Sequence, residues 1–118
     1  MTATVAVLPA SRWRELLEEQ WQARLLRVTE LSLAYYEAGE HVSPEAAGGT
    51  VRELGRLQQQ TVTARRALAN TEEALGRLSD GRYGHCEQCG RDIPARWLVR
   101  IPDTRYCPRC LPPRGLPS

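Results

Sequence analysis

Apolar residues recur at helical spacing through the first two thirds of the chain. Between Ser11 and Glu37 there is no proline or glycine, and apolar residues fall mostly three or four positions apart. This first stripe consists of Leu17, Trp21, Val28, Leu31 and Tyr35, interrupted once by Arg24. The spacing predicts an amphipathic helix over residues 11–37, with Ser11 as its N-cap.

A second stripe follows a stricter heptad pattern. In alternating three- and four-residue steps it comprises Leu54, Leu57, Thr61, Ala64, Leu68, Thr71, Leu75 and Leu78. Thr50 and Glu53 fit a capping box before it, and Gly81 suits a left-handed C-cap after it. We expect this helix to begin at Thr50, because Gly48-Gly49 would weaken a continuous helix. Ser43-Pro44-Glu45 is an alternative start, with proline in the first turn.

Two helices of similar length joined by a short break can bury their stripes by running antiparallel. The predicted fold is therefore mainly α, an antiparallel coiled-coil helical hairpin over residues 11–80 followed by a small lobe. The hairpin would be about 40 Å long at the helical rise per residue, with a tip loop at residues 38–50. Residues 1–10 and 112–118 are expected to be tails. A dimeric coiled coil is an alternative use of the same stripes.

Four cysteines form two CxxC pairs in the last third of the chain. Cys86 and Cys89 are followed, after seventeen residues, by Cys107 and Cys110. Each pair can aim two sulfurs at one ion, and two such pairs complete a tetrahedral shell. This separation is typical of zinc sites, so we predict one structural zinc ion in a four-cysteine zinc-ribbon lobe over residues 81–111.

The surroundings of the cysteines favour a closed structural site. Gly90 permits a tight turn whose backbone can donate to thiolate sulfur. His85 stands beside Cys86, but four thiolates already complete the shell, so we expect His85, like His41, to be solvated. A redox-active CxxC pair and an iron–sulfur cluster are the alternatives. A shell without an open position disfavours metal hydrolysis, and the sequence has no nucleophile–base pairing and no phosphate-binding glycine loop. We therefore predict that the protein is not an enzyme.

Positive charge is concentrated at the end of the chain. Residues 81–118 carry seven Arg against one Glu and two Asp, which is +4, while the whole chain carries +2. Zinc on four thiolates would lower this segment to about +2, too little to imply strong non-specific nucleic-acid binding. A weak nucleic-acid-binding zinc ribbon remains an alternative. It would use Arg82, Arg91, Arg96, Arg100, Arg105 and Arg109.

The apolar runs also bear on location. None approaches the ~20 residues that a membrane-spanning helix needs, and Met1–Pro9 lacks the regions of a signal peptide. We expect a cytoplasmic monomer with no membrane contact. In the cytoplasm, clustered cysteines favour metal over disulfides.

The first cysteine pair lies in the segment GRYGHCEQCG at residues 81–90. Together with Ile93-Pro94, Pro102 and the final CxxC, it resembles the DksA/TraR zinc-finger family. The motif match covers residues 81–110, and the hairpin agrees in architecture. The resemblance implies a bacterial transcription regulator that binds RNA polymerase without direct sequence-specific contact with DNA. In that family the coiled coil enters the secondary channel and the zinc lobe stays outside. A zinc-ribbon adaptor with a different protein partner is the alternative function.

The predicted tip departs from the family pattern. Active members resemble one another in an Asp-x-x-Asp-Ala motif there, whereas this chain has no Asp in that region, residues 43–48. Glu45 is the acid at the corresponding place and Glu40 lies upstream, so both are candidate partner-binding residues. Trp97 stands where relatives commonly carry Arg. The prolines at 112–113 prevent the C-terminal helix that many relatives have.

Overall fold

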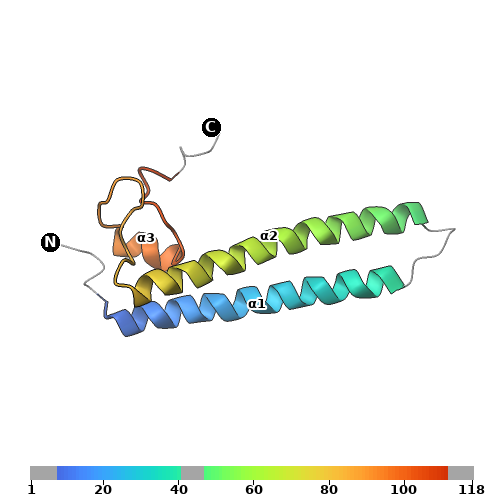
Figure 1. Ribbon diagram of the computed structural model, residues 1–118, viewed down its shortest axis with the longest axis horizontal. Helices are drawn as coiled ribbons and strands as arrows, with labels where there is room; N and C mark the ends of the chain where they lie inside the picture. Colours follow the sequence, from blue (N-terminus) through green and yellow to red (C-terminus); the bar gives the residue numbers. More distant parts are fainter. Residues whose placement is uncertain (1–7, 41–46, 112–118) are drawn as a thin grey trace. The chain divides into compact units, whose positions relative to one another are not determined.

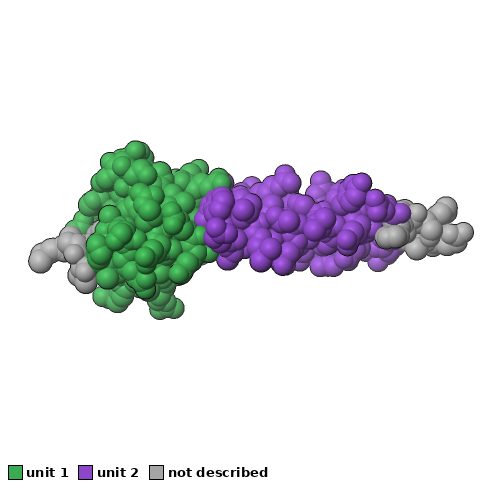
Figure 2. Space-filling model, turned by 90° about the horizontal axis from the view of Figure 1, so that it is seen from below, with its two compact units in different colours: residues 1–20, 70–118 green, residues 21–69 purple. Residues whose placement is uncertain are grey.

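The computed structural model describes residues 8–40 and 47–111. Its helices are α1 (Ala10–Glu40), α2 (Ala47–Ser79) and the short α3 (Ala95–Arg100). The long helices α1 and α2 run antiparallel, side by side (Figure 1), which confirms the predicted mainly α hairpin with a C-terminal four-cysteine lobe. Residues 1–20 and 70–118 form one compact unit, unit 1, and residues 21–69 form a second, unit 2 (Figure 2).

The first helix starts one residue before the predicted cap. The backbone N–H groups of Arg12 and Trp13 donate to the carbonyl oxygen of Pro9, at 2.9 and 3.3 Å. Pro9 therefore occupies the N-cap position and Ser11 lies in the first turn, so the prediction for Ser11 is wrong. Proline has no N–H to leave unpaired, and its preset φ is compatible with the start of a helix.

The connection between the long helices is shorter than the predicted tip loop 38–50. α1 continues to Glu40, and α2 already begins at Ala47 rather than at Thr50. Gly48 and Gly49 fall in the first turn of α2, where backbone N–H groups have no acceptor within the helix. The cost of glycine applies chiefly to helix interiors, so two glycines do not delay the start of this helix. The alternative start at residues 43–45 lies outside the described residues.

The end of α2 is a Schellman motif. Gly81 has a φ of +78°, and its N–H donates to the carbonyl of Leu78 at 3.2 Å. The N–H of Arg82 donates to the carbonyl of Arg77 at 2.8 Å. These two bonds satisfy carbonyls at the end of the helix, which confirms Gly81 as the left-handed C-cap glycine.

In unit 2 the facing stripes of α1 and α2 form a seam. Leu31 and Leu57 are buried, with exposed fractions of 5% and 6%, and the neighbouring heptad positions Thr61, Ala64 and Leu68 are partly buried. Arg24, the interruption in the first stripe, donates from Nη1 to the carbonyl oxygen of Ala67 at 2.8 Å. Its guanidinium therefore satisfies a backbone acceptor, while its aliphatic stem can lie along apolar surface.

Unit 1 has its own core, formed by both helices and the lobe. Its buried residues are Trp13, Leu17, Ala74, Tyr83, Cys86, Ile93, Leu98 and Cys107. The rings of Trp13 and Tyr83 pack at a centroid distance of 5.8 Å. α3, which the sequence patterns did not predict, contributes Leu98 to this core. Within the described part of the chain, no helix is long and apolar enough to span a membrane.

The seam predicts a sharp difference between two positions of α2. Leu57→Ala should lower the free energy of unfolding by about 2–3 kcal/mol, because it removes a buried side chain and leaves a cavity. Gln59→Ala, two residues away on the exposed surface, should change it by no more than about 0.5 kcal/mol. Denaturant unfolding at a fixed zinc concentration measures both. Equal unfolding midpoints for the two variants would contradict the seam.

Candidate metal centre

The four cysteine sulfurs converge on one point between the two CxxC turns. We call residues 86–89 the first knuckle and residues 107–110 the second knuckle. All four Sγ atoms lie within 4.8 Å of one another, and those of Cys89 and Cys107 are 3.8 Å apart. Four sulfurs placed tetrahedrally at about 2.3 Å from a zinc ion are separated by about 3.8 Å. The donor set and its spacing therefore fit one zinc ion with a closed four-sulfur shell.

The first knuckle is shaped by backbone donors inside the CxxC pair. The N–H groups of Gln88 and Cys89 point at Cys86 Sγ, at 3.4 and 3.5 Å. Gly90 has a φ of +78°, and its N–H donates to the carbonyl of Cys86 at 2.9 Å. Gly90 thus closes the turn through its left-handed conformation, and the expected donation to sulfur comes from the two residues before it.

The second knuckle is closed by backbone hydrogen bonds in the same way as the first. The N–H groups of Cys110 and Leu111 donate to the carbonyl of Cys107, at 3.0 and 2.9 Å. The two knuckles are joined directly, because the N–H of Glu87 donates to the carbonyl of Arg105 at 2.8 Å. This bond places the first CxxC turn beside the segment that precedes the second, which brings the two sulfur pairs together.

The cysteines at the two ends of the site differ in acidity. Burial alone would raise the pKa of the Cys86 thiol, but hydrogen bonds from the backbone of Cys107, Cys89 and Gln88 lower it to about 6. Burial, together with hydrogen bonds to the neighbouring thiols, raises the pKa of Cys110 to about 12. The backbone donors around Cys86 therefore favour its thiolate, the form that binds zinc, whereas burial at Cys110 disfavours it.

His85 lies outside the sulfur cluster, as predicted. Its Nδ1 is 2.9 Å from Asp92 Oδ1, and both side chains are about half exposed. The two residues also form an isolated antiparallel β-bridge, which fixes the imidazole beside the carboxylate. His41 and Glu45 lie outside the described residues, and Glu40 is exposed at the last position of α1.

A buried arginine, which sequence reasoning missed, ties α2 to the lobe. Arg77 is 5% exposed, and its Nη2 is 3.4 and 3.3 Å from the carbonyl oxygens of Asp103 and Thr104. Glu87 lies 4.0 Å from the same guanidinium and also pairs with Arg105. In the sequence Arg77 lies next to the stripe position Leu78, so the heptad pattern predicts an exposed polar residue there. Only its place in the last turn of α2, two residues before Ser79, hinted at a role.

Two further contacts connect α1 and α2 to the segment before the second knuckle. Thr71 donates from Oγ1 to Gln20 Oε1 at 2.7 Å, and Gln20 Nε2 donates to Asp103 Oδ1 at 3.3 Å. Tyr83 donates its hydroxyl to the carbonyl of Pro102 at 2.8 Å, and burial raises the pKa of that phenol. The lobe is thus held by specific polar contacts as well as by its core.

Comparisons with known proteins agree with this geometry. Residues 81–113 match the sequence model of the prokaryotic dksA/traR C4-type zinc finger. An uncharacterized protein of Aquifex aeolicus (strain VF5) is 46% identical over 43 residues, which are 36% of this chain and 30% of that protein. The chain therefore matches less than a third of that relative's length.

The dksA/traR finger is of the C4 type, and its four sulfurs have zinc spacing here, so the lobe holds one structural zinc ion. Similarity in fold extends over more of the chain than similarity in sequence. A solved structure titled "Structure of transcription factor DksA2 from Pseudomonas aeruginosa" matches with a TM-score of 0.79 at 22% identity. The match covers 83% of this chain and 76% of that one.

Zinc content should depend on each sulfur. Cys107→Ser should lower the bound zinc well below one ion per chain and loosen the lobe, because the metal supplies folding energy there. Arg109→Ser changes an exposed residue inside the same knuckle and should keep the full zinc content. Metal analysis of both purified proteins measures the difference. Full zinc content in Cys107→Ser would show that another residue serves as the fourth ligand.

Arg77 should matter for stability without being a ligand. Arg77→Ala removes a charged donor from two carbonyl groups and should cost about 2 kcal/mol in the free energy of unfolding. Arg82→Ala removes an exposed ion pair with Asp80 and should cost no more than about 1 kcal/mol. Zinc content should stay unchanged in both. Unfolding monitored by Trp fluorescence provides the test, and equal losses in the two variants would contradict the role of Arg77.

Proposed function

We propose that this protein is a bacterial transcription regulator that acts by binding RNA polymerase. One observation carries the proposal, namely that a dksA/traR C4-type finger at residues 81–113 follows a helical hairpin whose fold matches a transcription factor over 83% of the chain. This 83% is a larger fraction of the chain than the hairpin or the lobe makes up by itself. The likeness therefore supports the arrangement as a whole rather than the finger in isolation.

The zinc site supports a binding role rather than a chemical one. We propose Cys86, Cys89, Cys107 and Cys110 as its ligands, which leave no position for water or substrate. The ion would fix the lobe and, through it, the ends of α1 and α2 that belong to unit 1. On this proposal the protein is not an enzyme, and its effect on transcription comes from the surface it presents to the polymerase.

We further propose that the coiled coil enters the secondary channel of the polymerase while the zinc lobe remains outside. The end of α1 would then be the part nearest the catalytic site. Glu40 supplies an exposed carboxylate at that end, and Glu45 follows it in the chain. In a space poor in water a carboxylate interacts more strongly with metal-bound or basic groups than it does in bulk solvent.

A nucleic-acid-binding ribbon is less well supported. Of the six arginines that would serve it, Arg82 pairs with Asp80 at 3.0 Å, and Arg105 pairs with Glu73 and Glu87. These acids offset the positive charge on the side of the lobe that faces α2. A protein adaptor with another partner is distinguished from the polymerase regulator by the binding experiment below.

The carboxylate of Glu45 should affect the regulation of transcription more than the binding of RNA polymerase. Glu45→Ala should leave the affinity for RNA polymerase nearly unchanged, because the contacts along the helices remain. It should weaken the effect on transcript yield in vitro by about fivefold, the value of roughly 1 kcal/mol from one charge interaction. Co-purification with polymerase in moderate salt measures the first quantity, and run-off transcription the second.

Glu30→Ala is the matched control, since Glu30 is an exposed acid on α1 well before the tip. It should behave like the parent protein in both assays. An unaltered transcript profile with Glu45→Ala, under conditions where the parent has an effect, would reject the tip mechanism. Failure of the parent protein to retain polymerase would reject the polymerase proposal and leave the adaptor.

A further inference from the structure

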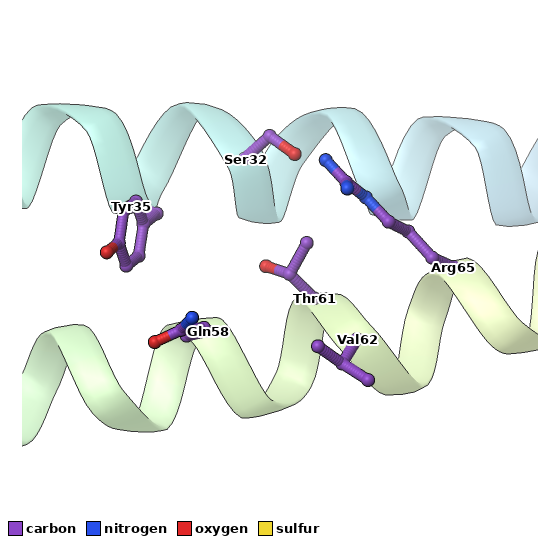
Figure 3. A pocket seen from close by; sticks show the side chains of 6 residues that line it. All are labelled: Ser32, Tyr35, Gln58, Thr61, Val62 and Arg65. Atoms are coloured by element: carbon purple, nitrogen blue, oxygen red, sulfur yellow. The ribbon is translucent and has the colours of Figure 1, made fainter.

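Charged side chains are distributed differently in the two units. In unit 2, the groove shown in Figure 3 is lined by five uncharged residues and Arg65. In unit 1, a cleft of about 330 Å³ is lined by residues of α2 and of the lobe. Its lining consists of one glycine, three acids and three arginines, namely Glu73, Gly76, Arg77, Asp80, Arg82, Glu87 and Arg105. Opposite charges thus meet where α2 contacts the lobe.

Glu87 connects both sides of this cleft. It lies inside the first knuckle, directly after Cys86, and its side chain is 36% exposed. Glu87 Oε1 is 3.5 Å from Arg105 Nη1, and Glu87 Oε2 is 4.0 Å from Arg77 Nη1. The two carboxylate oxygens therefore face two different guanidinium groups, one from the lobe and one from α2.

The two arginines extend these contacts to α2 and to the second knuckle. Arg105 forms a further ion pair, from Nη2 to Glu73 Oε1 on α2. Arg77 Nη2 is 3.4 and 3.3 Å from the carbonyl oxygens of Asp103 and Thr104, which precede the second knuckle. Four side chains thus form a continuous ion-pair network, in the order Glu73, Arg105, Glu87 and Arg77.

The network is fixed to both knuckles through the backbone as well. The N–H of Glu87 donates to the carbonyl of Arg105 at 2.8 Å, and Arg105 lies two residues before Cys107. Glu87 and Arg105 therefore meet through main chain and side chain, which joins the segments that carry Cys86 and Cys107. Residues that orient metal ligands from outside the ligand shell commonly change metal affinity by about 10–100-fold when they are mutated.

We propose that Glu87 is a positioning residue for the zinc site, which holds the two knuckles at the spacing that zinc requires and so slows the loss of the ion. It acts through Arg105 and Arg77, and Glu73 supports it from α2. The proposal rests on the four cysteine ligands proposed above, and it does not depend on binding to RNA polymerase.

The direction of the effect separates positioning from simple charge. Four thiolates around one zinc ion carry a net charge of about −2, and a carboxylate near them adds repulsion. Loss of the negative charge of Glu87 should by itself make the site hold zinc more tightly. If Glu87 positions the knuckles, the same loss should make zinc leave faster. Glu87→Gln distinguishes the two because their effects have opposite signs.

Transfer of zinc from the loaded full chain to an excess of a colorimetric chelator measures the release rate. Glu87→Gln keeps the backbone N–H that donates to Arg105, and it should release zinc about fivefold faster than the parent protein. Glu73→Gln changes a residue of α2 that touches the site only through Arg105, and it should release zinc about twofold faster. Both variants should still bind one zinc ion per chain when zinc is in excess.

Asp80→Asn is the matched control, because it removes an acid of the same cleft that pairs with the exposed Arg82. It should release zinc at the rate of the parent protein. Release from Glu87→Gln at or below the parent's rate, or at the rate of Asp80→Asn, would overturn the proposal. A parent protein that binds no zinc would overturn the cysteine ligands, and this proposal with them.

Salt tests whether the ion pairs themselves are responsible. Raising the ionic strength from about 0.05 to about 0.5 M screens ion pairs, so it should accelerate zinc release from the parent protein by about threefold. Release from Glu87→Gln should respond much less, because its network is already broken. A variant that merely destabilises the lobe would keep the salt dependence of the parent, so an unchanged dependence in Glu87→Gln would also overturn the proposal.

Discussion

Closure of the two CxxC knuckles on one zinc ion is the constraint on which unit 1 depends. Cys86 and Cys107 are themselves core residues, 3% and 4% exposed, beside Ile93 and Leu98. Within the described lobe the regular secondary structure amounts to one isolated bridge and the short α3, and the other backbone hydrogen bonds close local turns or join single residues. A lobe of this size has little apolar surface to bury, and the metal supplies the missing folding energy.

The two units differ in how they use polar side chains. In unit 1, Arg77 and Gln20 satisfy backbone and side-chain groups of the lobe, so the polar contacts fix one arrangement. In unit 2, the hydroxyls of Thr29 and Thr61 turn back to their own helix, and Arg24 contributes one cross-helix bond. The seam of unit 2 therefore rests on leucines separated by small residues. Such a seam leaves grooves at its sides.

Patterns with a strict physical cause were predictable from the sequence. The heptad of α2 identifies positions that are buried or partly buried, although it misses the buried Ala74 and Arg77 beside Leu75 and Leu78. The CxxC spacing indicates a tetrahedral donor set. Gly81 was predictable because the left-handed conformation at the end of a helix selects glycine. The starts of α1 and α2 were not predictable, because cap preferences of about 1 kcal/mol are small beside the gain from extending a packed helix. α3 was missed because six residues are too few to establish a period.

The burial of Arg77 and its contacts could not be predicted from the sequence, for a different reason. Its partners, Asp103 and Thr104, are about 26 residues away in sequence and offer backbone carbonyl groups, which any residue type supplies. No pairing rule based on side-chain types can identify such a contact.

The central functional claim is that the tip end of the hairpin reaches the interior of RNA polymerase. Photo-crosslinking tests it directly, with a photoreactive residue at position 40 in one variant and at the exposed zinc-lobe position 109 in another. The account predicts that position 40 crosslinks polymerase segments that line the secondary channel near the active site, whereas position 109 crosslinks only the outer surface. Crosslinks from position 109 to the channel interior, or none to polymerase from position 40, would contradict it.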